Sequence, residues 1–406
     1  MTAPRRPATL RYRAFDQSAA RSGDRKTAPP APPATGAGSR IMTIDPKPIA
    51  SRASWKGSTL DWRADALHVF RPDEIEEIDA GLQHLRGLGD LDLPEITPET
   101  FPLPTVGAYF ARLRDELRWG RGFVLLRGLP RERYSADDMA RIYYGFGAHL
   151  GAPGPQSWQG ELLGNVIDVS DIEADPRGYH KGGRQNFHTD SSDVVALLCL
   201  RRAKAGGKSR IASSVGIHDA ICERRPDIAR RLYEGFRYRR MELDARFGEG
   251  VQVSEQPVPI YVARDGELSS YYMLNYAKMA AEHGFSTLSD FDLEALEEIQ
   301  RLANSEEFHL DMSIEEGDIQ FLNNRIMLHS RTHYEDWPEV SQRRHMLRLW
   351  LQMPSWPAMP AEQVLHTAGD RLLWRRQRRP GMEFPTAYIE DMAQYLREGR
   401  KLVAAA

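Results

Sequence analysis

The chain has 406 residues, of which 41% are hydrophobic and 27% are charged, and its formal net charge is −3. This balance is typical of a soluble globular protein, and it excludes a protein that relies on general basic charge to bind nucleic acid. No apolar run reaches the roughly 18 residues that span a bilayer, so we expect no membrane partner.

The cysteine content restricts both the compartment and the kind of metal site. Two cysteines, Cys199 and Cys222, are too few for a disulfide framework, so we expect a reducing compartment, the cytoplasm. They are also too few for a zinc site built from thiolates. Any metal in this chain would therefore be held by histidine and carboxylate.

The first 41 residues differ in composition from the rest of the chain. They contain six prolines, eight basic residues and two acidic residues. Low hydrophobicity with proline runs does not repay the entropy of ordering, so residues 1–41 are predicted to be a disordered Pro/Arg-rich tail. Two alternatives stay open: an organelle transit peptide, and translation from Met42.

Helices are predicted first along the chain. Residues 72–88 begin with acidic side chains and predict a helix. Residues 122–130 are an apolar run stopped by Gly-Leu-Pro, which predicts a buried strand. Residues 135–151 begin with a serine N-cap and end at a glycine, so they predict a second helix. Residues 155–185 show no period and predict a long loop.

Strands dominate the later part of the chain. The run VVALLCL (194–200) predicts a buried strand, followed by a Gly-Gly turn, a short strand and the start of a helix. Residues 288–304 predict a helix, residues 315–331 predict a strand, a turn and a strand, and residues 343–353 predict a long strand. Helices gathered early and strands late, without βαβ alternation, favour an α+β fold with antiparallel sheets.

The stretch NFHTDSSDVV places His188 and Asp190 two residues apart. Residues i and i+2 of an extended chain point to the same side, so both side chains could reach one metal ion. A second histidine would complete the two-histidine, one-carboxylate set of non-haem Fe(II) oxygenases, which leaves three positions open. The same spacing recurs at 309–311 and at 333–335, and taken alone the pair is better explained as a structural turn.

His329 is the candidate third ligand, because it ends the apolar strand pattern IQFLNNRIMLH. In the strand that follows, Arg344 and Arg348 share one face and three leucines share the other. Arginines on an inward sheet face are costly unless they meet anions, so the pattern predicts a carboxylate-binding site. The alternative is a solvent-facing side with arginine stems lying along the sheet.

Three segments together resemble a known family. FHTDSSDVVALLCLRRAKAGGKSRIASS, GDIQFLNNRIMLHSRTHYEDW and RRHMLRLWL look like the TauD/TfdA (taurine dioxygenase-like) family of Fe(II)/2-oxoglutarate-dependent oxygenases, over roughly residues 123–354. The resemblance implies a double-stranded β-helix, a distorted jelly roll, with flanking helices. It also implies that His188, Asp190 and His329 bind iron and act as the catalytic centre.

The same resemblance implies further roles. Arg344 is expected to bind the distal carboxylate of the co-substrate 2-oxoglutarate, and Ser209 in GGKS takes the place of a threonine that helps to hold it. Arg348 resembles the position that holds a substrate anion in sulfonate-using members. The serine is a departure from the family pattern, and the residues after His329 match no substrate pattern. Asp190 argues against halogenation, because related halogenases lack this carboxylate.

Other polar and aromatic residues give weaker signals. Asn186 and Asn323 could orient the imidazoles, although ordinary turn chemistry is favoured for both. His309 with Asp311, His333 and His345 are interpreted as structural or hydrogen-bonding groups, and His180 as a possible pocket residue. The candidate substrate contacts are Gln156, Trp158, Asn165, Tyr179 and residues 271–276.

We therefore expect a dioxygenase that uses Fe(II), 2-oxoglutarate and O2 to oxidise, most simply by hydroxylation, an unactivated C–H bond of a small organic substrate, with release of succinate and CO2. An anionic or amino-acid-like substrate is suggested by Arg348. A non-catalytic jelly-roll binding protein and a His/Asp/His metal-dependent hydrolase are the alternatives. A single oxygenase domain is expected over 50–380, with a C-terminal helix or tail over 381–406. A homo-oligomer is compatible with the sequence.

Overall fold

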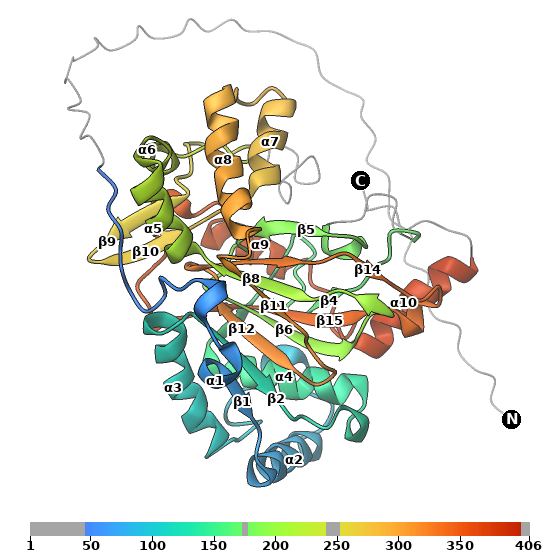
Figure 1. The fold of residues 1–406 in the computed structure, drawn as a ribbon. Helices are drawn as coiled ribbons and strands as arrows, with labels where there is room; N and C mark the ends of the chain where they lie inside the picture. The colour runs from blue at the N-terminus through green and yellow to red at the C-terminus, as the bar shows by residue number, and fades with distance from the viewer. Residues whose placement is uncertain (1–44, 173–177, 241–251, 399–406) are drawn as a thin grey trace, which may run out of the picture. The chain divides into compact units, whose positions relative to one another are not determined.

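A mixed sheet of seven strands forms the centre of the computed structural model, which describes residues 45–172, 178–240 and 252–398 (Figure 1). Its strands, in spatial order, are β1 (Leu67–Val69), β2 (Phe123–Arg127), β12 (Ile319–Asn323), β6 (Val194–Arg201), β15 (His345–Gln352) and β3 (Ala152–Gly154), and β4 (Gly164–Val166) also pairs with β15. The β1–β2 pair is parallel, and the other pairs are antiparallel. The predicted tail, 1–41, lies outside the described residues.

A smaller antiparallel sheet carries the second set of strands. Its order is β11 (His309–Met312), β8 (Ser209–Ser213), β13 (Met327–Arg331) and β5 (Gln185–His188). Two short ladders complete the strands, one of β9 (Tyr261–Arg264) with β10 (Glu267–Ser270), the other of β7 (Ala205–Gly206) with β14 (Tyr334–Glu335).

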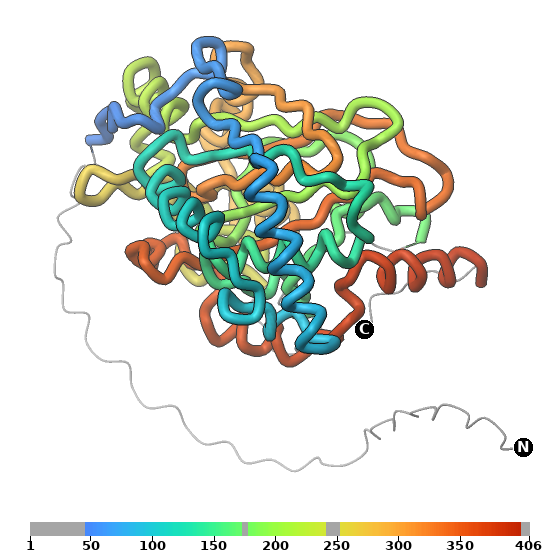
Figure 2. Tube along the Cα trace, turned by 90° about the horizontal axis from the view of Figure 1, so that it is seen from below, coloured from blue at the N-terminus to red at the C-terminus, as the bar shows by residue number. Residues whose placement is uncertain are grey.

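Three helices cover one face of the larger sheet: α2 (Pro72–Gly87), α3 (Val106–Trp119) and α4 (Ala136–Leu150) (Figures 1 and 2). Leu347, Leu349 and Leu351 of β15 pack in the same buried cluster as the apolar faces of these helices. Alternation along β15 therefore turns its leucines toward the helices, so Arg348 points to the opposite face. Arg344, directly before the strand, lies on that opposite face as well.

The remaining helices are α1 (Trp62–Asp65), α5 (Ser214–Arg224), α6 (Pro226–Glu234), α7 (Leu274–Glu282), α8 (Asp290–Ala303), α9 (Ala368–Arg375) and α10 (Pro385–Arg397). Single 3-10 turns occur at Gly57–Thr59, Leu93–Glu95, Arg131–Arg133, Gly178–His180, Val340–Gln342 and Ala361–Gln363.

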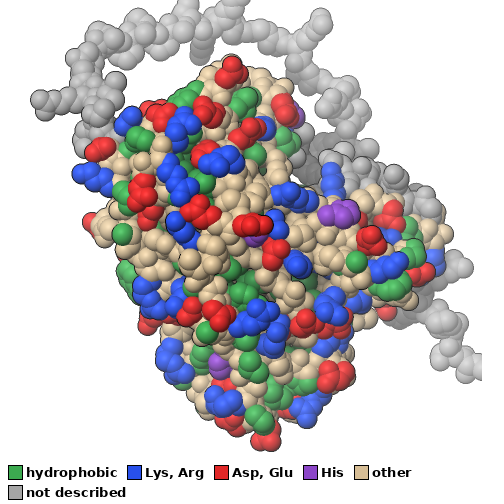
Figure 3. Space-filling view, viewed as in Figure 1, with side chains coloured by type: hydrophobic (Ala, Val, Ile, Leu, Met, Phe, Trp, Pro, Cys, Tyr) green, Lys and Arg blue, Asp and Glu red, His purple; other side chains and the backbone are tan. Residues whose placement is uncertain are grey.

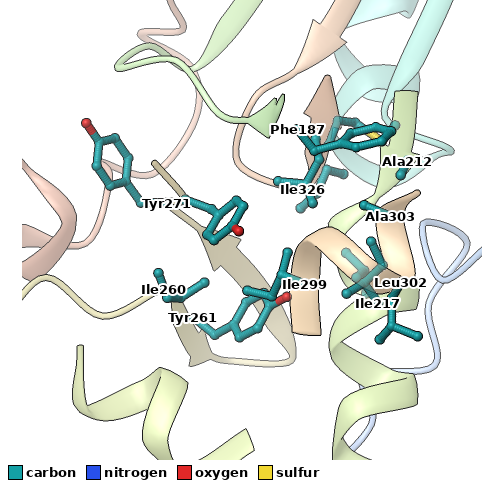
Figure 4. Close-up of a cluster of buried hydrophobic side chains, with 14 of the residues drawn as sticks. Phe187, Ala212, Ile217, Ile260, Tyr261, Tyr271, Ile299, Leu302, Ala303 and Ile326 are labelled. Atoms are coloured by element: carbon teal, nitrogen blue, oxygen red, sulfur yellow. The ribbon is translucent and has the colours of Figure 1, made fainter. Parts of the chain in front are cut away.

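A second buried cluster joins the smaller sheet to helices α5 to α8. Figure 4 shows Leu302 of α8 beside Ile217 of α5, and Ile299 of α8 beside Tyr261 of β9. Phe187 of β5 is 1% exposed and belongs to the same cluster. Burial of such a ring stabilises the fold by about 1.5–3 kcal/mol, and the alternation of the strand then turns the next residue, His188, the other way.

The structure confirms most of the predicted elements. Helices predicted at 72–88, 135–151 and 288–304 are α2, α4 and α8, and Ser135 caps α4 by accepting a hydrogen bond from the backbone N–H of Asp138. The predicted loop at 155–185 is wrong in part, since it contains β4 and a 3-10 turn. The mixed arrangement of helices with largely antiparallel sheets is the expected α+β class.

Acidic and basic side chains are interspersed over the face of the molecule drawn in Figure 3. Among the described residues, no helix combines the length and apolar character needed to cross a bilayer.

Candidate functional site

Strand pairing brings the predicted metal ligands together. In the smaller sheet, His329 of β13 lies directly opposite His188 of β5. Asp190 follows two residues after His188, beyond the end of β5. One nitrogen of each histidine and one oxygen of Asp190 lie within 4.8 Å of one another, and these are the only three residues among those described that form such a group.

The donor atoms face each other across a short gap. His188 Nε2 lies 3.9 Å from Asp190 Oδ1, and His329 Nε2 lies 3.8 Å from Asp190 Oδ2. The two imidazole rings are 4.3 Å apart between centroids. Two imidazoles and one carboxylate suit a borderline divalent ion such as Fe(II) and leave three coordination positions open, so the residues present fit this metal.

The histidines are prepared to act as neutral ligands. His188 Nδ1 donates a hydrogen bond to the carbonyl oxygen of Asn186 at 2.9 Å, which leaves the lone pair on Nε2 for a metal. Burial, together with the neighbouring His188 ring, lowers the pKa of His329 to about 3, so the His329 ring is neutral at physiological pH.

The backbone before His188 is fixed by a helix. β5 lies at the edge of the smaller sheet. Gln300 of α8 accepts a hydrogen bond from the N–H of Phe187 at 3.2 Å and donates one to its carbonyl oxygen at 2.7 Å. A side-chain amide thus replaces the missing neighbouring strand, and this satisfies backbone groups that would otherwise lack partners.

Asp190 is a buried carboxylate with dedicated partners. Its Oδ2 accepts a hydrogen bond from Trp350 Nε1 at 2.8 Å and one from Arg348 Nη1 at 3.4 Å. Burial by itself would raise the pKa of Asp190, but the positive charge of Arg348 and interactions with the two histidines outweigh it and lower the pKa below the usual value. The carboxylate is therefore ionised, as a metal ligand must be.

Asn324 orients this region; its neighbour Asn323, for which turn chemistry was favoured, does not. The Asn324 side-chain oxygen accepts the N–H of Asp190 at 2.9 Å, and its amide nitrogen donates to the carbonyl oxygens of Asp190 and, at 3.1 Å, Ser192. Asn323 instead donates to the carbonyl oxygen of Leu117. The sequence Asn-Asn predicts a turn but does not distinguish the two roles.

The three candidate ligands lie in a cavity of about 400 Å³ between the two sheets. β6 and β15 contribute to its wall from the larger sheet, and β5, β8 and β13 contribute from the smaller one. Besides the three ligands, its lining includes Tyr179, Lys181, Arg184, Asn186, Ser191, Leu197, Ser209, Met273, Tyr276, Arg331, Arg344, Met346, Arg348, Trp350, His366 and Trp374.

Arg344 is a buried cation without a carboxylate partner. Its side chain lines the cavity, the residue is 7% exposed, and its guanidinium makes no hydrogen bond or ion pair to any described residue. Burial lowers the pKa of Arg344. The Gly-Gly turn makes room for it: Gly207 has a φ of +68°, and a Cβ there would lie 3.2 Å from Arg344 Nε.

The other two predicted co-substrate residues also line the cavity, but both have partners in the protein. Ser209 Oγ donates to Gln320 Oε1 at 2.8 Å. Arg348 Nε donates to Gln156 Oε1 at 2.7 Å, while its Nη1 reaches Asp190. The charge of Arg348 is thus balanced by Asp190, whereas that of Arg344 is not.

Several weaker candidates lie outside the cavity. His309 and Asp311 sit in β11, where Asp311 pairs with Arg210 and His309 Nδ1 bonds to the carbonyl oxygen of Ser305, so this second His-x-Asp is structural. His345 is buried with its Nε2 2.8 Å from Asn165 Oδ1. Of the loop candidates, Tyr179 lines the cavity, while Gln156, Trp158, Asn165 and His180 are not part of its lining.

Arg331, His366 and Trp374 are among the cavity residues that the sequence did not predict. Arg331 lies two residues after His329 on the same strand face, so the rule that identified His188 with Asp190 could have found it. His366 and Trp374 come from the C-terminal segment, where no motif points to the cavity.

Known proteins resemble this chain in sequence. The model of the family described as "Taurine catabolism dioxygenase TauD, TfdA family" matches residues 89–350. FR-33289 synthase from Streptomyces rubellomurinus is 27% identical over 341 residues, which cover 81% of this chain and 97% of that protein. The taurine hydroxylase-like protein SAT17 from Stachybotrys chartarum is 28% identical over 315 residues, covering 73% and 77% of the two chains.

Solved structures share the fold at low sequence identity. The asparagine oxygenase in complex with Fe(II), 3-hydroxyasparagine and succinate superposes with a TM-score of 0.56 at 17% identity, over 70% of this chain and 93% of the other. The non-haem iron oxygenase OrfP, in a complex with Fe, succinate and a dihydroxyarginine, gives 0.54 at 13% identity, over 74% and 99%. Because the family model spans more than half of the sequence, this chain belongs to the TauD/TfdA family of dioxygenases.

Proposed function

We propose that His188, Asp190 and His329 hold the Fe(II) of this enzyme and that Arg344 binds the distal carboxylate of 2-oxoglutarate. The chain is an Fe(II)/2-oxoglutarate-dependent dioxygenase, as expected from the sequence. The observation that carries the residue assignment is the convergence of the three side chains from two strands and the loop after β5, in one cavity that also holds an unpaired buried arginine.

Bound Fe(II), with 2-oxoglutarate and O2, supplies the oxidation of an unactivated C–H bond, with release of succinate and CO2. The protein's own residues bind, orient and shield these components. His188 and His329 present neutral nitrogens, and Asp190 presents an ionised oxygen oriented by Trp350 and Asn324.

Arg344 orients 2-oxoglutarate by binding its distal carboxylate. A guanidinium binds a carboxylate through two parallel hydrogen bonds, and in a buried cavity such a charge-assisted pair is strong. Ser209 lies in the same lining, and its hydroxyl oxygen can add a contact while it donates to Gln320. Met346 and Leu197 form an apolar part of the wall.

Arg348 is proposed to position Asp190, in addition to the expected contact with a substrate anion. Its side chain is 9% exposed, and its guanidinium is bonded to Gln156 and close to Asp190. It also lies over the Tyr179 ring, 4.6 Å from the centroid. A substrate anion that used Arg348 would share it with Asp190.

The substrate is proposed to be a small organic molecule that is anionic or amino-acid-like. Cationic side chains in the cavity lining outnumber acidic ones: Lys181, Arg184, Arg331, Arg344 and Arg348 face a single carboxylate, Asp190. Two structural neighbours are complexes with a hydroxylated asparagine and a hydroxylated arginine, and this supports the amino-acid-like alternative.

The finer architecture is also a proposal. The two facing sheets, with iron-binding candidates at the smaller one, support a double-stranded β-helix with flanking helices. The oxygenase domain is proposed to extend past residue 380 to the end of α10, because Met392 packs against Ile167 and Val340. Two buried free cysteines are compatible with a cytoplasmic location.

Anaerobic addition of Fe(II) and 2-oxoglutarate tests the assignment. The wild-type protein should develop a visible charge-transfer band, and H188A should lose it. H309A is the matched control, because it removes the histidine of the same motif outside the cavity, and it should keep the band. Retention of the band by H188A would overturn the ligand set. Succinate formation in air would separate the oxygenase from a binding protein or a hydrolase.

A further inference from the structure

Arg331 is a second buried cation in the cavity whose charge is not balanced by a carboxylate. The residue is 5% exposed and lines the cavity. Its guanidinium donates three hydrogen bonds, all to backbone carbonyl oxygens: those of Gly183, at 2.9 and 3.2 Å, and Lys181, at 2.8 Å. Its Nη1 makes no hydrogen bond to any described residue.

Three other buried arginines have a carboxylate partner. Arg343 contacts Asp171 at 2.7 Å, Arg348 contacts Asp190 at 3.4 Å, and Arg240 contacts Asp370 at 2.8 Å. Because an unpaired buried charge is costly, this fold normally gives such a group an acid. Within the described part of the chain, Arg331 and Arg344 lack one, and both line the same cavity.

The register of the strands places Arg331 at the same end of the cavity as Arg344. On β13, Arg331 is the direct partner of Ser209 on β8. Both guanidinium groups also lie over the ring of Tyr334, at 4.7 Å for Arg331 and 5.5 Å for Arg344. The Tyr334 hydroxyl is buried and has no hydrogen-bond partner among the described residues. Two cations of the cavity lining thus share one aromatic ring at this end of the site.

We propose that Arg331 is a second anchor for the distal carboxylate of 2-oxoglutarate and helps Arg344 to select a dicarboxylate over a 2-oxo acid without a distal charge. This inference rests on the proposed function. A carboxylate has two oxygens and about four lone-pair sites, so it can accept from two guanidinium groups. A dicarboxylate would compensate both buried charges, whereas a 2-oxo acid that ends in a methyl group would leave both unpaired.

The test compares two co-substrates by binding rather than by turnover. Anaerobic titration of the Fe(II) protein with 2-oxoglutarate and with 2-oxopentanoate, which has a methyl group in place of the distal carboxylate, gives two dissociation constants. R331Q should weaken 2-oxoglutarate binding by about 10- to 100-fold, the range for a hydrogen bond to a charged group, and should leave 2-oxopentanoate binding unchanged. R210Q is the control, because Arg210 lies beside Ser209 but pairs with Asp311 outside the cavity.

Each outcome decides the inference. If R331Q weakens both ligands equally, Arg331 only holds the backbone of Lys181 and Gly183, and the proposal is wrong. R331K keeps the charge but loses the fork that binds these carbonyls, so it should keep the preference for the dicarboxylate; loss of that preference would overturn the proposal. Unchanged binding in R331Q, with a normal wild-type band, rejects this inference alone. Absence of the band from the wild-type protein rejects the proposed function together with it.

Discussion

Replacement of Arg344 by methionine should separate stability from co-substrate binding. Arg344 has no carboxylate partner among the described residues, and it is 7% exposed. Removing an unpaired buried charge in favour of an apolar side chain of similar length is expected to leave the free energy of unfolding of the metal-free protein unchanged or to raise it by about 1–4 kcal/mol. Binding should respond in the opposite direction.

The loss of binding follows from the two hydrogen bonds that a guanidinium makes to a carboxylate. Each hydrogen bond to a charged group is worth about 1.5–3 kcal/mol, so R344M should lower the affinity for 2-oxoglutarate by about 100- to 10,000-fold. Anaerobic titration of the charge-transfer band measures the affinity, and urea denaturation of the metal-free protein measures the stability.

Arg127 provides the contrast. It is bonded to Asp318, whose side chain is 1% exposed, at 2.6 Å. R127M leaves that carboxylate buried and unpaired, so it should destabilise the protein by about 3–5 kcal/mol without changing 2-oxoglutarate affinity. If R344M destabilised the protein as much as R127M does, or bound 2-oxoglutarate as tightly as the wild-type protein, the reasoning about the unpaired charge would be refuted.

Two further predictions concern groups beside the site. N324A should lower Fe(II) affinity by about 10- to 100-fold and the free energy of unfolding by about 1–3 kcal/mol, whereas N323A should lower the free energy of unfolding alone. Isothermal titration with Fe(II) distinguishes the two variants. Equal Fe(II) affinities would contradict the role of Asn324. Burial, reinforced by the charge of Arg201, lowers the pKa of His345 to about 3, so the folded protein favours the neutral imidazole. Above pH 6.5 this residue does not reduce the free energy of unfolding. Between pH 6.5 and 3 the free energy of unfolding falls, because the unfolded chain binds a proton that the folded protein does not. H345Q should therefore remove about 1.4 kcal/mol of the stability loss that urea denaturation measures between pH 7.5 and pH 5.5, and an unchanged loss would be inconsistent with this assignment.

The sequence was most informative where strand alternation is strict. On β15, period-two alternation correctly placed the leucines against the helices and Arg344, Met346, Arg348 and Trp350 in the cavity. The His-x-Asp spacing likewise predicted that His188 and Asp190 face one point, and the pairing of β13 with β5 brings His329 there.

The sequence was least informative where contacts depend on tertiary structure. Nothing in NN at 323–324 shows which asparagine turns toward Asp190, because the choice depends on how the β12–β13 turn meets the chain after β5. The charge of Arg348 is balanced by Asp190, and its guanidinium also donates to Gln156; both partners lie far away in the sequence. Whether a buried arginine is paired can be read only from the assembled fold.

The cavity wall formed by His366 and Trp374 lies beyond residue 350, where the match to the family model ends. The candidate metal ligands and Arg344 lie within the matched region. Two stretches of the polypeptide thus share in building the cavity: the family-matched region, and a C-terminal segment that adds part of the wall. An exchange of the segment after residue 354 would change the shape of that wall and keep all three candidate metal ligands in place.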